Sequence, residues 1–311
     1  MDTQAVSYIA VDIAKDTLRV QTTRKGFDVL NSAPGIRALL RQTRCLPNRH
    51  FVCEASGGYE RPLVEALHKE GISVSLVSAA RVRDFARSEG TKAKTDPIDG
   101  RMILRFAQEK RPAPTPPPSP RQRRLMDLLD RREQLTEMLK REKTRLQKPA
   151  CPKEIERSLR RSIRLLEKEL EKIDALIGEL IGEEDTTARA FKELTAIKGV
   201  GPVTAWTLIG YLPEITSLSR AEVAALAGLA PYNRDSGKTK TLRRIFGGRA
   251  KVRRCLYMAA GVAARHNEVI RTYVESLRAR GKPYKWALVA AMRKLLLHAQ
   301  SCLKKHEISL A

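Results

Sequence analysis

The sequence predicts a mixed α/β domain, then a long helical arm, then an all-helical C-terminal domain. Short runs of β-branched and apolar residues, separated by turn residues, fill the first part and indicate strands. A charged segment without aromatic residues follows, with apolar residues at heptad spacing. The last part shows helical periodicity and turns. We therefore expect an α/β domain at 1–110, a proline-rich linker at 111–120, a coiled-coil helical arm at 121–187 and a basic α-helical domain at 188–311.

Five strands are expected in the α/β domain, three in succession and two alternating with helices: SYIAVDI, TLRVQTT, FDVLNS, HFVCEAS and ISVSLVS. Helices are predicted in GIRALLRQTR, ERPLVEALHKEG, AARVRDFARSE and from Pro97 to about Gln108. This order favours a mixed sheet. Nucleases of the RNase H and RuvC type have the same order of elements. A RuvC/RNase H-like fold is therefore expected, with the first and fourth strands side by side.

The linker and arm follow from two patterns. The segment RPAPTPPPSP at 111–120 cannot be helical and should act as a stiff spacer. Beyond it a heptad seam is formed by apolar residues, namely Ile155, Leu159, Ile163, Leu166, Leu170, Ile173, Ile177 and Leu180. The pattern breaks around Pro149 and Pro152, so two antiparallel helices are predicted to fold back there. The seam could pack within its own chain or form a dimer.

The C-terminal domain is predicted to be all-helical. AFKELTAIKGVGPVTAWTLIGYL has the form of a helix–hairpin–helix, and SRAEVAALAGL begins with a serine cap. A loop, APYNRDSGKTKT, comes next, and three amphipathic helices complete the chain. Trp206 and Trp286 lie on apolar helix faces and are expected in the core.

The charge of the chain indicates a polyanionic partner. Lys and Arg total 59 against 35 acids, which gives a net charge of +24. Nucleic acid is the expected partner, because each neutralised phosphate releases a counterion; an anionic membrane surface is the alternative. The five cysteines form no C-x-x-C pair, and no apolar run is long enough to span a bilayer. We expect a cytoplasmic protein with no membrane partner.

Four acids are candidates for a metal site. Asp12 interrupts the apolar first strand, Glu54 interrupts the fourth, and Asp96 and Asp99 open a helix one turn apart. Two-metal phosphodiester chemistry requires three or four converging carboxylates, and Mg²⁺ prefers oxygen ligands. Each strand acid could instead lie at an exposed strand end. Asp96 and Asp99 could equally be a helix cap and the end of a capping box.

The motifs AVDIAKDTLRV, CEASGGYE, VRDFARSEGTKAKTDPIDGRMI and APYNRDSG together resemble the DEDD-type insertion-sequence transposases. That family includes the bridge-RNA-guided recombinases and, more distantly, the pilin-gene inverting enzymes. The resemblance implies that Asp12, Glu54, Asp96 and Asp99 bind the metal, which is expected to be Mg²⁺, with Mn²⁺ as a substitute. Asp16, which lies in the turn after the first strand, is the alternative to Asp12 for the first of these acids. Pro97 replaces a commonly basic residue, which affects local DNA contact rather than metal binding.

Ser236 lies in a strongly basic loop. From Arg234 through Arg254 there are nine basic residues and one acid, Asp235. Taken alone, Ser236 reads as an ordinary turn serine before Gly237. The resemblance implies instead that Ser236 is the nucleophile that forms a covalent phosphoserine, at a composite site with the metal domain of a neighbouring protomer.

Further residues are expected to contact nucleic acid. In IKGVGPV the two glycines permit a hairpin whose free amides can face a phosphate; a plain helix turn is the alternative. A basic run also borders the proposed metal site. The expected contacts are Arg81, Arg83, Lys92, Lys94, Lys198, Gly199, Gly201, Arg234, Lys238, Lys240, Arg243 and Arg244.

The leading hypothesis is a Mg²⁺-dependent transposase or recombinase that acts on donor and target DNA. The resemblance implies a structured bridge RNA as guide and a bacterial protein that is associated with the nucleoid when bound. The composite site implies a homodimer, with tetramers on paired DNA. One alternative is a RuvC-like Holliday-junction nuclease that uses water. Another is a non-catalytic architectural DNA-binding protein.

Overall fold

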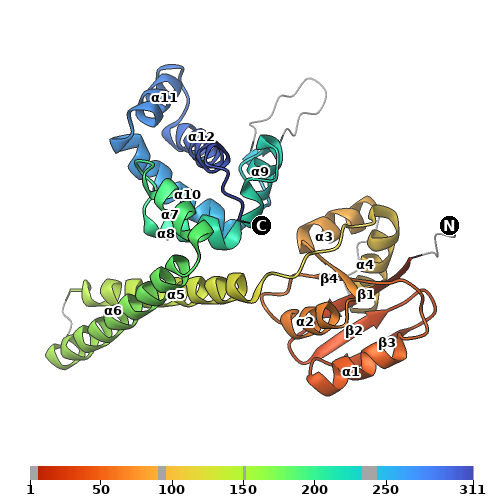
Figure 1. Cartoon of the computed structure of the whole chain (residues 1–311). Coiled ribbons are helices and arrows are strands. Elements are labelled where there is room, and N and C mark those ends of the chain that lie inside the picture. The colour runs from red at the N-terminus through yellow and green to blue at the C-terminus, as the bar shows by residue number, and fades with distance from the viewer. Residues whose placement is uncertain (1–5, 90–95, 150–151, 233–243, 311) are drawn as a thin grey trace. The chain divides into compact units, whose positions relative to one another are not determined.

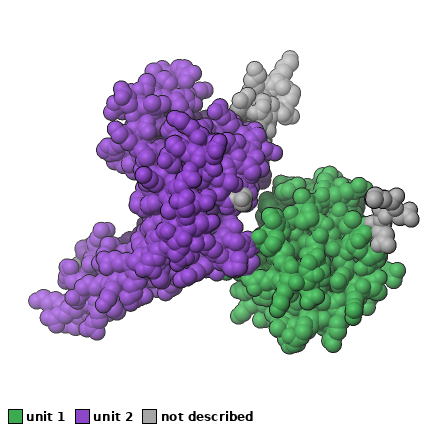
Figure 2. Space-filling view, in the orientation of Figure 1, with its two compact units in different colours: residues 1–117 green, residues 118–311 purple. Residues whose placement is uncertain are grey.

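A computed structural model of the chain describes residues 6–89, 96–149, 152–232 and 244–310. Only the backbone is described at 96–99, 232 and 244. The chain divides into two compact units, residues 1–117 and 118–311 (Figure 2). Each unit is built around its own core, so we describe them one at a time.

The first unit is a five-stranded mixed sheet in the order β3-β2-β1-β4-β5 (Figure 1). The first three strands pair antiparallel, whereas β1, β4 and β5 run parallel. The sequence prediction of five strands in a mixed sheet is confirmed. The strands are β1 (Ser7–Ile13), β2 (Thr17–Gln21), β3 (Gly26–Leu30), β4 (Arg49–Glu54) and β5 (Ser73–Val77).

Helices cover both faces of this sheet. Alternate strand residues point to opposite faces, so each face carries its own apolar cluster. Ile9, Val11 and Phe51 pack against α1 and α2, while Ala10 and Val52 pack against α3 and α4. The helices are α1 (Ala33–Gln42), α2 (Arg61–Lys69), α3 (Ala79–Ser88) and α4 (Asp96–Lys110).

The proline-rich segment differs from a simple spacer. Residues 111–119 are not helical, as predicted, whereas Pro120 already begins the next helix; part of the segment lies along the edge strand β5. The backbone N–H of Thr115 donates to the carbonyl of Val74 at 2.8 Å, and its Oγ1 accepts from the N–H of Leu76 at 3.0 Å. Ser75 Oγ donates to the carbonyl of Ala113 at 2.7 Å. These bonds satisfy groups of β5 that an open sheet edge would leave unpaired.

The second unit begins with two long helices, α5 (Pro120–Leu146) and α6 (Lys153–Gly182). Ion pairs show that the two helices are antiparallel, because residues later in α5 pair with residues earlier in α6 or just after its end: Arg121 with Glu183, Arg132 with Asp174 and Lys143 with Glu167. The seam of α6 therefore packs within its own chain. Ile177 and Leu180 at the base join the core of the C-terminal helices, Ile163 is also buried, and Ile155 near the tip is 52% exposed.

The C-terminal part packs around α8, α10 and α12 (Figure 1). Ser219 caps α9 in a capping box with Glu222, as the sequence predicts for a serine cap. The domain is not purely helical, because a two-residue antiparallel pair forms between β6 and β7, on either side of the 233–243 segment. Trp206 is buried in this core and Trp286 is half-buried.

The elements of this part are α7 (Asp185–Thr195), α8 (Pro202–Tyr211), η1 (Pro213–Ile215), α9 (Arg220–Leu226), β6 (Pro231–Tyr232), β7 (Arg244–Ile245), α10 (Ala250–His266), α11 (Glu268–Ala279) and α12 (Tyr284–Lys305). None of the helices among the described residues is long and apolar enough to cross a bilayer.

Candidate active site

Asp12 and Glu54 lie on neighbouring parallel strands. The last pairs of the β1–β4 register are Ala10 with Val52 and Val11 with Cys53, so Asp12 and Glu54 follow at the next position. Both side chains are half-buried. Because side chains alternate along a strand, both carboxylates fall on the face of Ala10 and Val52, which α3 and α4 cover. The two acids therefore share one face of the sheet, at the C-terminal ends of two neighbouring inner strands.

The first turn of α4 lies over the same face. A Cβ placed on Gly100 would be 3.5 Å from Cβ of Gln21 and 3.8 Å from Cγ of Arg19. Arg19 is the antiparallel partner of Asp12 in the β1–β2 register. Because α4 begins at Asp96, the backbone of Asp96 and Asp99 forms the helical turn directly before Gly100. The side chains of these two acids lie outside the described part of the structure.

The donor set fits a hard divalent cation. Carboxylate oxygens from Asp12 and Glu54 would supply the oxygen ligands that Mg²⁺ prefers, and half-burial leaves a side open to water and substrate. Among the side chains that the structure describes, no group of three or more metal-ligating residues gathers. A complete DEDD set would require the side chains of Asp96 and Asp99 in addition.

Two residues that the sequence analysis did not single out hold the loops beside these acids. Asn31 Nδ2 donates to the carbonyls of Ala14 and Tyr59, both at 3.0 Å, and so joins the loops after β1 and β4. Glu60 Oε2 accepts from the N–H of Ser56 at 3.1 Å, from its Oγ at 2.9 Å and from the N–H of Gly58 at 2.9 Å. The only signal in the sequence is the polar, glycine-containing stretch SGGYE.

The electrostatics of this loop follow from those bonds. Burial raises the pKa of Glu60, but the backbone and Ser56 hydrogen bonds stabilise the carboxylate more, so the pKa is lowered overall. Burial, and then the charge of Glu60, raises the pKa of Cys53 to about 12. Cys53 therefore stays protonated and apolar in the sheet, directly before Glu54.

The predicted basic contacts of the first unit divide into two groups. Arg81 and Arg83 are exposed on α3, which packs against α4. The Arg81 guanidinium lies 5.6 Å from the ring centroid of Phe106, and Arg83 Nε donates to the carbonyl of Ala79 at 3.2 Å. Lys92 and Lys94 lie outside the described residues.

The segment IKGVGPV, for which the sequence analysis expects a hairpin, includes the tight turn between α7 and α8. Lys198 and Gly201 are exposed, and Gly199 has φ +105°. A Cβ on Gly199 would lie 2.5 Å from Cβ of Ala263, so glycine is required there. Asn267 Nδ2 donates to the carbonyl of Lys198 at 3.1 Å and fixes the turn against the start of α11.

Ser236 belongs to a segment that the structure does not describe. The same is true of four basic candidates, Arg234, Lys238, Lys240 and Arg243. The flanking backbone is described: Pro231 pairs with Ile245 and Tyr232 with Arg244. The two ends of the serine-bearing segment are therefore held side by side.

Comparison with known proteins links both units to one class of enzyme. A transposase model of the DEDD IS110 type matches residues 9–149, and a model described as transposase IS116/IS110/IS902 family matches residues 192–275. The chain is 26% identical to the pilin gene-inverting proteins of Moraxella bovis and of Moraxella lacunata, over 96% of each chain. It is also 33% identical to an uncharacterized insertion element IS110 protein of Streptomyces coelicolor, over 32% of this chain and 25% of that protein.

Proposed function

The chain belongs to the IS110 family of DEDD transposases and is thus a DNA transposase or recombinase, and we propose that it exchanges DNA strands through a metal-assisted phosphoserine. The observation that carries this proposal is the position of Asp12 and Glu54. They are adjacent in the β1–β4 register, half-buried on one face, in the segment that matches the DEDD model.

In this proposal Asp12, Glu54, Asp96 and Asp99 bind a divalent cation, Mg²⁺ or Mn²⁺. When bound, the cation supplies Lewis-acid stabilisation of the charge that develops on the phosphate oxygens. Support comes from the oxygen-only donor set and from the start of α4 over the same sheet face. Arg81 and Arg83, exposed on the adjacent α3, are proposed to hold the DNA backbone beside the acids, together with Lys92 and Lys94.

Ser236 is proposed to be the nucleophile. Its hydroxyl loses a proton, the bond from Oγ to phosphorus forms, and one phosphodiester P–O bond breaks to leave a DNA hydroxyl that takes up a proton. A hydroxyl of the second strand then attacks the phosphoserine, which reforms a phosphodiester and returns the hydroxyl to Ser236. The number of phosphodiester bonds is unchanged, so strands are exchanged without hydrolysis.

We propose that the two halves of the site come from different protomers, which requires a dimer and, on paired DNA, a tetramer. Donor and target DNA are the substrates. The hairpin residues Lys198, Gly199 and Gly201 and the basic residues around Ser236 would contact the backbone, with a structured bridge RNA selecting the sequence. The high net charge of +24 supports a large nucleic-acid contact.

A covalent adduct tests this function. The protein is incubated with Mg²⁺, labelled DNA that flanks its own gene and RNA transcribed from that flank, then denatured and separated by gel electrophoresis. Wild type and a Thr239→Ala control should yield labelled protein, and Ser236→Ala should yield none. Free nicks that survive Ser236→Ala would instead indicate a nuclease that uses water. Intact DNA functions in Asp12→Ala and Glu54→Ala would indicate an architectural protein.

A further inference from the structure

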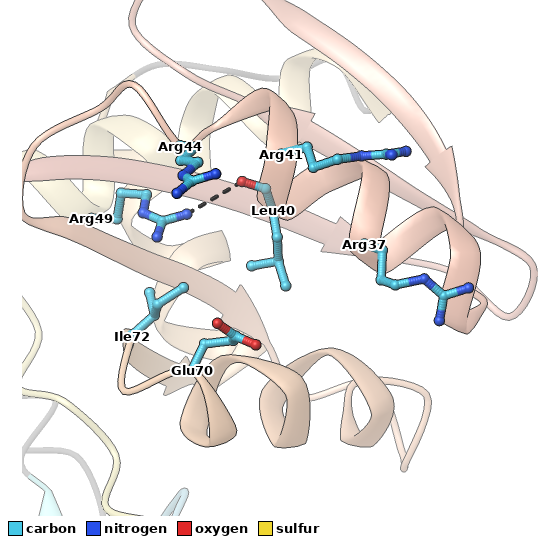
Figure 3. Close-up of a pocket in the computed structure, with 7 residues that line it drawn as sticks. All are labelled: Arg37, Leu40, Arg41, Arg44, Arg49, Glu70 and Ile72. Carbon is cyan, nitrogen blue, oxygen red and sulfur yellow. Dashed lines mark hydrogen bonds between the residues drawn. The ribbon is translucent and has the colours of Figure 1, made fainter.

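An arginine-lined cavity lies on the first unit, between α1 and the end of α2 (Figure 3). Its volume is about 460 Å³, and its lining includes Arg37, Arg41, Arg44, Arg49 and Glu70. Figure 3 shows Arg44 and Arg49 together at one end, Arg37 and Arg41 leaving α1 at the other, and Glu70 facing the cavity from α2. Side chains of four arginines thus line one hollow, and the guanidinium groups of Arg37 and Arg41 extend away from those of Arg44 and Arg49 (Figure 3).

Local structure explains why these arginines gather. Arg37, Arg41 and Arg44 are spaced by four and three residues, so they follow one face along α1 and its C-terminal end. The opposite face of α1 buries Ile36 and Leu39 in the core. Arg49 is held at the start of β4, where it donates to the carbonyl of Leu40 at 3.4 Å.

The arginines of this cluster, Arg37, Arg41, Arg44 and Arg49, form no ion pair within the described part of the chain, and Glu70 pairs with none of them. The sequence has no acid between Asp28 and Glu54. Other arginines of the same unit do find partners, as Arg19 does with Asp28 at 2.9 Å. Four positive charges with a single carboxylate beside them, Glu70, favour the binding of an anion.

The cavity is separate from the candidate active site. Arg49 begins β4 and Glu54 ends it, so the two are about 16 Å apart along the strand at roughly 3.3 Å per residue. The helices beside the cavity, α1 and α2, cover one sheet face, whereas Asp12 and Glu54 fall on the other. An anion in this cavity cannot be the phosphate that the acids would act on.

We propose that this arginine cavity binds the phosphodiester backbone of a nucleic-acid segment that is not being cut. Guanidinium groups match phosphate oxygens in geometry and can donate two hydrogen bonds to one phosphate. Three exposed arginines along one line suit successive phosphates better than one small anion. This inference takes one thing from the proposed function, namely that the bound polyanion is a nucleic acid.

The test measures binding without divalent metal, so that cleavage plays no part. The cavity variant is Arg37→Gln/Arg41→Gln/Arg44→Gln, which keeps Arg49 and its bond to Leu40. The control Arg24→Gln/Lys282→Gln/Lys305→Gln removes the same charge from scattered exposed positions. Probes are a 60-base-pair random duplex DNA and bulk transfer RNA, followed by fluorescence anisotropy from about 0.05 to 0.2 M salt.

For at least one probe, the cavity variant should reduce the slope of log Kd against log salt by about two to three, and affinity by about tenfold or more. The control should change the slope by less than about one. If only transfer RNA binding is weakened, the cavity binds RNA. If only duplex binding is weakened, it binds DNA, and if both are weakened it binds either backbone. Equal effects of the two variants on both probes would overturn the proposal.

A second variant separates binding from folding. Arg37→Lys/Arg41→Lys/Arg44→Lys keeps the charges and should restore most of the salt slope. Because Asp12 lies on the other sheet face, the three arginine substitutions should lower affinity by the same factor in wild type and in Asp12→Asn. The loss of cleavage by Asp12→Asn with Mg²⁺ tests the proposed function independently of the cavity.

Discussion

At the scale of single residues, the loop after β4 depends on one carboxylate. Glu60 accepts three hydrogen bonds from Ser56 and Gly58, immediately beyond Glu54. Asp12 and Glu54 could be read from the sequence because each interrupts an apolar strand. Glu60 and Asn31 could not, because their roles depend on where two loops meet in space. The sequence also gave no reason to separate the arginines of α1 from an ordinary exposed helix face.

Substitution of Glu60 by Gln should lower the free energy of unfolding by about 1 kcal/mol at pH 7, because Glu60 is only half-buried and solvent screens its bonds. The folded pKa of Glu60 lies below the ordinary value of 4.5. Its stabilisation is thus complete above about pH 4.5 and is lost as the pH falls through the folded pKa. Urea unfolding of wild type and Glu60→Gln at pH 7 and pH 3.5 measures the difference in their unfolding free energies. A difference that is as large at pH 3.5 as at pH 7 would contradict this role of the Glu60 carboxylate.

The thiol of Cys53 should be unreactive in the folded protein. With a pKa of about 12, only about one thiol in 10⁴ is ionised at pH 8, and the side chain is fully buried. Cys45 is exposed and serves as the internal control. Iodoacetamide at pH 8 followed by peptide mapping should show Cys45 modified and Cys53 intact. Equal labelling would mean that β4 is not buried as described.

At the scale of elements, periodicity predicted the strands of the mixed sheet well. Alternation along β1 and β4 is regular because each residue faces one of two apolar helical layers. The docking of Thr115 on β5 was not predicted, because a backbone hydrogen bond at a sheet edge leaves no pattern in side chains. The β6–β7 pair was missed for a similar reason, since two residues are too few to show alternation.

The hairpin between α7 and α8 provides a test with a matched control. Gly199→Ala forces a Cβ to 2.5 Å from Ala263 at φ +105° and should destabilise the fold by about 2 kcal/mol or more. Gly201 has φ −87° and no neighbour within 4 Å, so Gly201→Ala should change stability by less than about 1 kcal/mol. Urea unfolding of the two variants compares them directly. Equal losses would contradict the close contact of the turn with α10.

At the scale of the whole molecule, two units with separate cores carry the two halves of the proposed site. The acids are in the first unit, and the segment that bears Ser236 is in the second. The family assignment covers both, because its two models match residues 9–149 and 192–275. Patterns in the sequence could predict the elements of both units. They could not show whether the acids and the serine of one site come from the same protomer, because that depends on contacts between chains.

Mixing two inactive variants tests whether the site is shared between protomers. Asp12→Asn and Ser236→Ala should each lose strand exchange alone. A mixed dimer would hold one site with intact acids from one chain and an intact serine from the other, so activity should return on mixing. The measurement is recombination of a labelled DNA pair after subunit exchange. No recovery, with exchange verified by light scattering and differential tags, would place the whole site in one chain.

Anomalous diffraction from crystals grown with MnCl₂ tests the central claim most directly, since manganese is located by its own signal. The account predicts a peak within about 2–2.5 Å of a carboxylate oxygen of both Asp12 and Glu54. The same peak should be absent from Asp12→Asn crystals. Manganese bound elsewhere, with no peak between these two carboxylates, would contradict the account.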